Sequence, residues 1–441
     1  MLGIESDLVF AGGLRWVYGG RAQGNDAAIG ARNSFVHHRR WLCCLFPVAW
    51  CDAHPPDALR GSVGFVRDYF KYLHGTYAWS DLFSQHNEHR LVTTRIVLLA
   101  DAMLFRMRGL LPIGVTYASL GTVALVGARL AAQPGLDRLA ASGLALGLLW
   151  STSQWLNLTW PFNVQFIFVH LSAFVCLVAL WQAIKSGSLA WLALAVAADG
   201  IAVASLGSGL LLIAPILFLG LWLRSWRPVA ILAAFHALFT GLYFTGYHWP
   251  VQSTLYLLEA GTIFRTAVEY VGTAAGWHEF FVGLGGVVLL AVLTVHISWL
   301  VIARKPVDGA CCVFAAVAVF SSIEALVVGY TRGSWGIHPR YATASVFFWA
   351  ALLAALWRMT HQSRIRLVVP SMAVGMVIVM NAPAFEASWR EEFAFLSRVT
   401  QDARRNTFNP LVMQRLYEHP WTAQVVARLR DLELGPFAPG R

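Results

Sequence analysis

The stretch "VQFIFVHLSAFVCLVALWQAI", residues 164–184, contains no Asp, Glu, Lys or Arg, and Lys185 follows it directly. A helix of about 20 apolar residues is long enough to cross a hydrocarbon core of about 30 Å. The stretch therefore predicts a transmembrane helix, and Lys185 is expected to mark the membrane surface at one of its ends.

Nine further apolar runs predict more spans of the same kind. They occupy approximately residues 110–128, 139–156, 188–205, 208–223, 228–246, 280–303, 309–329, 341–357 and 366–381. The mean hydropathy is +0.58 and only 13% of the residues are charged, so a soluble fold of this size could not bury the apolar surface. We expect an all-α, polytopic bundle of about ten or eleven transmembrane helices.

The basic residues predict the orientation of this bundle. If the spans alternate strictly, the cations of the short basic loops all fall on the side of Lys185: Arg129, Arg138, Arg224, Arg227, Arg304, Lys305, Arg358, Arg364 and Arg366. Cytoplasmic loops are enriched in Lys and Arg, so this side is predicted to be cytoplasmic. The net charge of +10 is thus dispersed over topology signals, which argues against nucleic acid as a partner. Only three of the 33 basic residues are lysines, a bias more typical of a GC-rich bacterial genome than of selection for phosphate contacts. For a bacterial multi-pass protein of this kind, we expect a location in the inner membrane.

The two ends of the chain are expected to differ from the bundle. Residues 1–40 have no clear periodicity and predict a poorly structured extension. "WLCCLFPVAW", residues 41–50, is too short for a comfortable span, so it is a shortened or tilted first helix, a signal-peptide-like segment or the remains of a longer helix. The transmembrane domain then covers 41–381, and residues 382–441 form a helical tail outside the cell.

The first outer loop, residues 55–109, is the most polar part of the domain. "GFVRDYFKYL", residues 64–73, predicts a short helix that places Asp68 and Tyr72 on one face. The sequence "SQHNEHRLVTTR", residues 84–95, is expected to begin a second helix that runs from about 85 to 105. Its polar face could line a cavity above the membrane, whereas the alternative role of such charges is anchoring at the interface.

Two histidines of this loop raise the question of a metal. His86 and His89 flank Glu88 and have suitable ligand chemistry. Further ligands at a recognisable spacing are missing from the sequence, so no metal site is predicted. The sequence identifies no cofactor with certainty. A role for a divalent metal ion is left open, with no sequence feature that supports it.

The segments "DYFKYLHG" (68–75) and "LFSQHNEHRLVTTRI" (82–96), together with the order of spans and outer loops, resemble the GT-C superfamily of integral membrane glycosyltransferases. They are similar in particular to a group of bacterial multi-pass proteins of that kind, over roughly residues 60–360. The resemblance implies a polyprenyl-phosphate-linked sugar donor, inverting transfer on the outer face and a catalytic carboxylate in the first outer loop, where Asp68 matches the position. The chain departs from the family in lacking a DxD or ExD pair in this loop and a WWDYG-type signature.

Inverting transfer from a sugar phosphate needs a base for the acceptor hydroxyl and cations for the leaving phosphate. We predict Asp68 as the base, with Glu88 as the second choice, because a partly desolvated carboxylate has a raised pKa. The alternative for each acid is an ion pair with a neighbouring cation: Arg67 or Lys71 for Asp68, and Arg90 or Arg95 for Glu88.

Arginines of two outer loops are predicted to bind the donor phosphate, because the guanidinium fork matches phosphate oxygens. Contact with lipid head groups is their alternative role. The full predicted substrate-binding set is Tyr72, His86, Asn87, His89 and Arg90 of the first loop, with Arg332, His338, Arg340 and Tyr341 of "RGSWGIHPRYA", residues 332–342.

Asp199 and Glu324 lie inside predicted spans, where a charge costs about 2.5 kcal/mol or more on insertion scales. Each acid is a functional candidate; its alternative roles are a neutral, hydrogen-bonded packing residue or a structural partner of His170, His236 or His296. These groups leave a second function open, namely a lipid-linked glycan flippase or proton-coupled transporter. A third possible function is that of an assembly subunit. The predicted function is a glycosyltransferase that moves a hexosyl or pentosyl unit to a glycan, lipid or protein acceptor at the outer face of the bilayer.

Overall fold

The computed structural model describes residues 63–249, 260–332, 339–360, 367–382 and 422–438, with isolated positions between 390 and 405. These residues belong to one compact unit, Pro55–Arg441, and are helical without any strand. The expected extension and first span, residues 1–50, lie outside the described residues, as does most of the expected tail.

Every one of the ten apolar runs contains a helix. The bounds are α5 (Leu110–Ala131), α6 (Leu136–Leu149), α8 (Val164–Ser186), α9 (Leu189–Ser205), α10 (Ile213–Leu223), α11 (Trp226–Phe244), α13 (Glu279–Ile302), α14 (Gly309–Arg332), α15 (Ala342–Thr360) and α16 (Val368–Met380). By length and composition, 6 of the described helices can cross a membrane, namely α5, α8, α11, α13, α14 and α15, while α9, α10 and α16 are shorter apolar helices. The helical bundle is confirmed at this level, and the larger number of spans stays a prediction.

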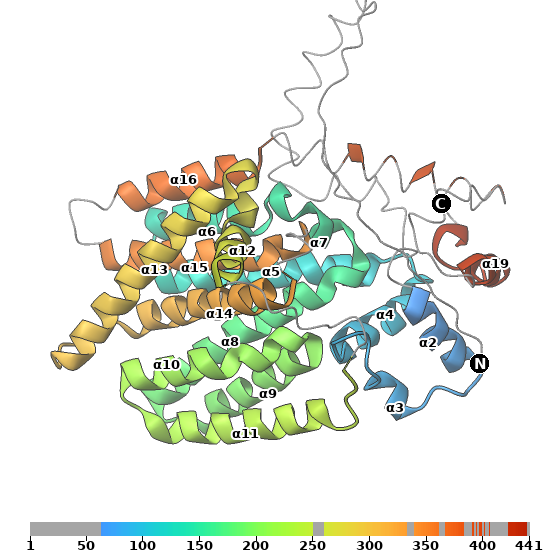
Figure 1. Ribbon diagram of the computed structural model, residues 1–441, viewed down its shortest axis with the longest axis horizontal. Helices are drawn as coiled ribbons and strands as arrows, with labels where there is room; N and C mark the ends of the chain where they lie inside the picture. Colours follow the sequence, from blue (N-terminus) through green and yellow to red (C-terminus); the bar gives the residue numbers. More distant parts are fainter. Residues whose placement is uncertain are drawn as a thin grey trace, which may run out of the picture. The chain divides into compact units, whose positions relative to one another are not determined.

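Burial separates the central helices from the peripheral ones. In α8, α14 and α15, 72% of the apolar window is buried against other parts of the chain, compared with 33% in α5, 28% in α13 and 22% in α11. α14 packs against both α15 and α8, and α8 packs against α9 (Figure 1). The exposed apolar side chains of α11 and α13 are therefore the ones available to lipid.

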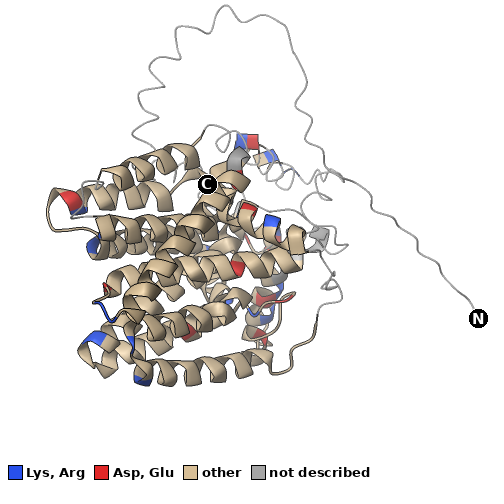
Figure 2. Cartoon of the chain, turned by 60° about the vertical axis from the view of Figure 1, so that its left-hand side comes forward, with Lys and Arg blue, Asp and Glu red and all other residues tan. Residues whose placement is uncertain are grey.

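One end of the bundle gathers the cations of the short loops, and we call it the cationic end. Contacts between helix termini bring these loops together: the Nε of Arg358 lies 2.8 Å from Asp308 Oδ2, and its Nη1 donates to the Leu130 carbonyl at 3.3 Å. Trp357 Nε1 donates to Asp137 Oδ1 at 3.2 Å. Figure 2 shows that charged residues lie mainly near helix ends and are sparse along the helices.

The opposite end, which we call the loop end, carries the first loop. Its helices are α2 (Val63–Leu73), α3 (Trp79–Leu82) and α4 (Val92–Phe105), shown in blue in Figure 1. α4 packs against α5, α8 and α9, and the Thr93 hydroxyl donates to Ser205 Oγ at 2.8 Å. The short helix expected at 64–73 is confirmed by α2.

The helix expected from residue 85 is wrong in its start, because α4 begins at Val92. The preceding residues form a reverse turn, so Asn87 and Arg90 share no helical stripe with Asp101. Asp101 instead accepts the N–H groups of Gly109 at 2.7 Å and Leu111 at 2.9 Å, which caps the start of α5.

Short elements complete the loop end. They are η2 (Thr152–Gln154), α7 (Trp155–Thr159), η3 (Pro161–Asn163), η4 (Gly207–Leu212), α12 (Ala260–Gly272), η5 (Thr273–His278) and η7 (Pro339–Tyr341). The tail helix α19 (Thr422–Asp431) and η8 (Gly435–Phe437) pack against α2 and α4 through a small apolar cluster that includes Val66, Ala102 and Leu429. The Gly435 N–H donates to the Arg106 carbonyl at 2.8 Å, so this part of the tail lies beside the first loop.

Candidate functional site

The polar sequence of the first loop forms a tight turn at residues 85–90. His86 and His89 exchange backbone hydrogen bonds of 2.7 and 3.0 Å, and Asn87 has the left-handed φ of 51° that asparagine tolerates. The Gln85 side chain pairs with the backbone of His248, donating to its carbonyl at 2.6 Å and accepting from its N–H at 3.0 Å. The turn is thereby fastened to the segment that follows α11.

Arg90 strengthens this attachment. Its Nε donates to the Tyr243 carbonyl at 2.6 Å, and its two other nitrogens donate to the carbonyls of Phe83 and Thr245. Carbonyls at a helix end lack partners inside the helix, so an arginine is well suited to satisfy them. The predicted phosphate role of Arg90 thus competes with three backbone acceptors, and its evident role is to position the turn.

The side chains of Glu88 and His89 lie together on this turn. His89 Nε2 is 3.6 Å from Glu88 Oε1, and the backbone N–H of Gly207 points at His89 Nδ1 at 3.3 Å. A backbone N–H can only donate, so Nδ1 is an acceptor and the proton of the neutral ring is on Nε2, facing Glu88. The hydroxyls of Tyr243 and Tyr247 donate to the Glu88 carbonyl at 2.8 and 3.2 Å, which fixes the backbone below the carboxylate.

Charged residues from two distant segments affect the pKa of His89. Burial and, to a lesser extent, the positive charge of Arg340 lower the pKa of His89 to about 4, while the charge of Glu324 acts in the opposite direction. His89 is therefore neutral at pH 7. The side chains of Arg340 and Glu324, from η7 and α14, are close enough to influence its protonation.

Arg340 is held by buried polar groups of the loop end. Asn157 Nδ2 donates to its carbonyl at 2.6 Å and to Thr343 Oγ1 at 2.7 Å, while Thr343 donates to Gln154 Oε1 at 2.8 Å. The guanidinium carbon lies 5.4 Å from the centre of the Tyr341 ring. These hydrogen bonds hold the backbone of Arg340 against the buried Asn157 side chain.

Beneath this layer lies a buried acid. Glu324 Oε2 is 3.1 Å from His170 Nε2, and both side chains are almost fully buried. Tyr270 of α12 is hydrogen-bonded to the same carboxyl group, and its ring lies 5.2 Å from that of Tyr341. Glu324 is eight residues from the end of α14, which is about 12 Å along a helix.

A second acid pair lies elsewhere in the bundle. Asp199 Oδ1 is 2.8 Å from His236 Nδ1, and His236 Nε2 is 3.1 Å from the Leu210 carbonyl. The carbonyl can only accept, so Nε2 carries a proton and a second proton is shared along the Nδ1 to Oδ1 contact. A histidine partner, one of the alternatives for each buried acid, is observed for Glu324 with His170 and for Asp199 with His236, whereas His296 stacks on Trp299.

Asp68 lies in a separate buried ion pair. Its Oδ2 is 3.2 Å from Arg95 Nε, and Arg95 also donates to the carbonyls of Leu82 and Ser84. Burial raises the pKa of Asp68, and the Arg95 charge acts against this. The alternative of an ion pair for Asp68 is thus observed, with Arg95 in place of the expected Arg67 or Lys71.

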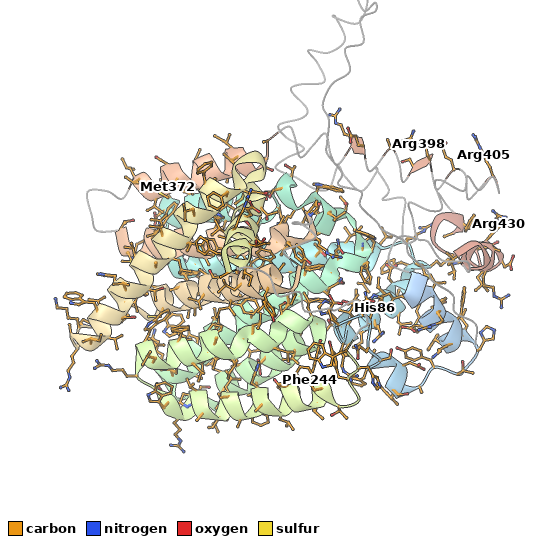
Figure 3. All side chains as sticks on the ribbon, viewed as in Figure 1. His86, Phe244, Met372, Arg398, Arg405 and Arg430 are labelled. Carbon is orange, nitrogen blue, oxygen red and sulfur yellow. The ribbon has the colours of Figure 1, made fainter. Side chains whose placement is uncertain are left out.

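The remaining predicted site residues are dispersed. His86 packs between Phe65 and Phe162, with ring centres 5.9 and 5.8 Å away, and lies where α2 to α4 meet the spans (Figure 3). Burial, followed by the Arg95 charge, lowers the pKa of His86 to about 4. Tyr72 is exposed and stacks on Tyr69, with ring centres 6.2 Å apart, and Asn87 is exposed on the turn. His338 and the side chain of Arg332 lie outside the described residues.

The structure thus forms a neighbourhood around His89: Glu88 lies on the same turn, and the charge of Arg340, beside the ring of Tyr341, acts on the histidine. Asp68 is instead engaged by Arg95, and Tyr72 is exposed on α2. Gly207 and Tyr270 belong to this neighbourhood without having been predicted. In the sequence, Tyr270 looks like any aromatic residue of an interfacial helix, and Gly207 contributes through its backbone, which side-chain chemistry cannot reveal.

A bound metal ion, or similarity to a known protein, would define the chemistry of this site further. In the ranges that the structure describes, no three His, Cys, Asp or Glu side chains are grouped to hold a metal ion, since His86 and His89 face different partners. No family model, curated protein or solved structure matches the chain.

Proposed function

We propose that the chain is a multi-pass membrane glycosyltransferase that moves a hexosyl or pentosyl unit from a polyprenyl-phosphate carrier to an acceptor at the loop end. The observation that carries this proposal is the contact between Glu88 and His89 in the first loop, with the charge of Arg340 from the distant segment η7 acting on the same histidine. A carboxylate and an arginine from distant segments are the two charges that inverting transfer from a sugar phosphate requires.

In this proposal Glu88 is the general base. The acceptor oxygen attacks the anomeric carbon, its proton passes to a Glu88 carboxylate oxygen, and the bond from the anomeric carbon to the phosphate oxygen breaks. The Nε2–H of His89 orients the carboxylate, and the planar donors of Arg340 stabilise the charge on the released polyprenyl phosphate. Glu88 replaces Asp68 as the base because Asp68 is buried against Arg95, where an acceptor hydroxyl has less access.

The location suits a lipid-linked donor. The neighbourhood lies at the ends of apolar helices, so a prenyl carrier in the bilayer can bring its phosphate to the loop end by lateral diffusion. Because the cations of the short loops between spans lie at the opposite end, the positive-inside rule favours a loop end that faces outward from a bacterial inner membrane.

The test uses the purified full-length protein in liposomes with synthetic polyprenyl-phosphate hexoses and pentoses, and measures released polyprenyl phosphate. Loss of a positioned base typically lowers the rate by about 10²- to 10⁴-fold, which is the expectation for Glu88→Gln. Arg340→Gln should also reduce turnover. Glu433→Gln is the matched control, because this acid is 64% exposed on the tail. An unchanged rate in Glu88→Gln, or no donor turnover by the wild type, contradicts the proposal.

A second candidate, a proton-coupled transporter or flippase of lipid-linked glycans, is favoured by the two buried acid–histidine pairs. Asp199 and Glu324 each hold a proton-accepting group inside the bundle, as proton relays do. Proton-driven transport that is lost in Asp199→Asn, with Glu88→Gln unaffected, would favour the transporter over the enzyme.

A further inference from the structure

An apolar pocket lies inside the bundle, away from the loop-end neighbourhood. Its empty volume is about 630 Å³, including the open mouth. Residues of α5, α6, α14 and α15 form most of its wall, with Phe174 of α8 and Ala373 of α16.

The wall of the pocket suits hydrocarbon and not water. None of the lining side chains is charged, and ten of the lining residues are small, namely Gly127 and the alanines at positions 124, 128, 131, 141, 145, 350, 351, 354 and 373. The indole N–H of Trp357, which also lines the pocket, is already donated to Asp137 at 3.2 Å. A buried water needs two or more polar partners, so this wall holds water poorly.

The pocket is elongated along the helices. On α15 the lining residues run from Phe347 to Trp357, and on α5 they run from Val123 to Ala131. At 1.5 Å per residue these segments span about 12 to 15 Å. Both segments end at the cationic end of the bundle. The pocket therefore runs parallel to the helices, as an acyl chain does in the leaflet at the cationic end.

One arginine stands beside this end of the pocket. Arg138 precedes the lining residue Ala141 by three residues on α6, and its Nε is shielded from solvent with no acceptor in the part of the chain that the structure describes. Arg129 lies on the opposite face of α5 from the lining residues and is exposed. Arg358 is different, because it is engaged by Asp308 and the Leu130 carbonyl.

We propose that this pocket binds one acyl chain of an anionic glycerophospholipid from the leaflet at the cationic end, with the lipid phosphate at Arg138. The apolar wall accounts for the chain, and the shielded guanidinium N–H of Arg138 accounts for the phosphate. The site is independent of the proposed sugar transfer, because it lies at the opposite end of the bundle and shares no residue with it.

The test compares lipid retention after exchange of the full-length protein into detergent and then into mixed micelles with phosphatidylglycerol or phosphatidylcholine. Native mass spectrometry counts the bound lipids. We expect one retained phosphatidylglycerol in the wild type and at least tenfold lower retention in Ala145→Phe, whose ring fills the pocket. Gly143→Phe on the same helix is the control, because it is exposed and an added Cβ meets no described atom within 4 Å.

A second variant tests the phosphate contact and does not depend on filling the pocket. Arg138→Gln should reduce the preference for phosphatidylglycerol over phosphatidylcholine at least threefold. The melting temperature of the wild type and of Gly143→Phe should rise with added phosphatidylglycerol. A wild type that retains no lipid, an Ala145→Phe variant that retains as much as the wild type, or an unchanged preference in Arg138→Gln would overturn the assignment.

Discussion

Replacing His86 by phenylalanine tests whether this histidine serves packing or substrate. The imidazole lies between the rings of Phe65 and Phe162, and a phenyl ring can take its place in this aromatic contact. We expect His86→Phe to fold, to keep its activity within about threefold of the wild type and to resist acid better. Direct binding of substrate by His86 would instead require a large loss of activity.

The magnitude follows from the pKa of His86, which burial lowers from 6.5 to about 4. The unfolded chain therefore binds the proton more tightly than the folded chain. The stability that His86 contributes is complete above pH 6.5 and is lost as the pH falls from 6.5 to 4. With 1.36 kcal/mol for each pKa unit, a change from pH 8 to pH 5 removes about 2 kcal/mol through His86.

The pKa of His89 is lowered in the same direction, so the wild type loses further stability through that residue. Its side chain is 31% exposed, and solvent reduces this contribution. The difference between wild type and His86→Phe isolates the part that belongs to His86.

The assay is thermal unfolding of the purified protein in detergent at pH 8 and pH 5, followed by near-ultraviolet circular dichroism. The drop in melting temperature between the two pH values should be clearly smaller in His86→Phe than in the wild type. Equal drops in both proteins would refute the reasoning, because His86 would then be solvated or charged in the folded state.

Three further changes test contacts of the loop end. Arg95→Met should destabilise the protein by about 3 to 5 kcal/mol, because Asp68 loses its buried partner, and Asp68→Asn in the same chain should restore part of this in thermal unfolding. Asp101→Ala should cost about 1 to 2 kcal/mol, since the start of α5 loses its cap; an unchanged melting temperature would contradict this. Gly207→Ala places a Cβ 2.9 Å from His89 Nδ1, so donor turnover should fall roughly ten- to hundredfold with little change in melting temperature, and a normal turnover number would argue against the role of His89.

The helices were predictable because a long apolar run has few structural options in a bilayer. Residues 164–184 predicted α8 almost to its ends, where Gly187 has the left-handed φ of 67° that terminates the helix. The histidine partners of Asp199 and Glu324 also followed from the chemistry, because a buried acid needs a polar partner.

The roles within the first loop were harder to predict. Arg90 and Arg95 have the same chemistry, yet one holds backbone carbonyls after α11 and the other holds Asp68. Their partners depend on tertiary contacts that no local pattern encodes. The turn at 86–89 was not predicted, for a similar reason. Its residues fit a polar stripe on a helix, but the backbone pairing of His86 with His89 forms a turn in place of that helix.

The predicted site residues show the same contrast between local chemistry, which the sequence reveals, and tertiary contacts, which it does not. Glu88, Arg340 and Tyr341 were named from their chemistry and their outer loops, and the structure places them near one another through His89 and the ring of Tyr341. Asp68 was named through the resemblance to glycosyltransferases, and its ion pair with Arg95 could not be read from residues 27 positions apart.

The most direct measurement is photocrosslinking of the full-length protein with a polyprenyl phosphate that carries a diazirine on its first isoprene unit, followed by peptide mass spectrometry. We predict adducts at the loop end, on residues 85–90 or 339–341, that unlabelled polyprenyl phosphate suppresses and that Arg340→Gln weakens. Adducts confined to the cationic end, or adducts that the unlabelled lipid does not suppress, would contradict a phosphate site formed by Arg340 and the first loop.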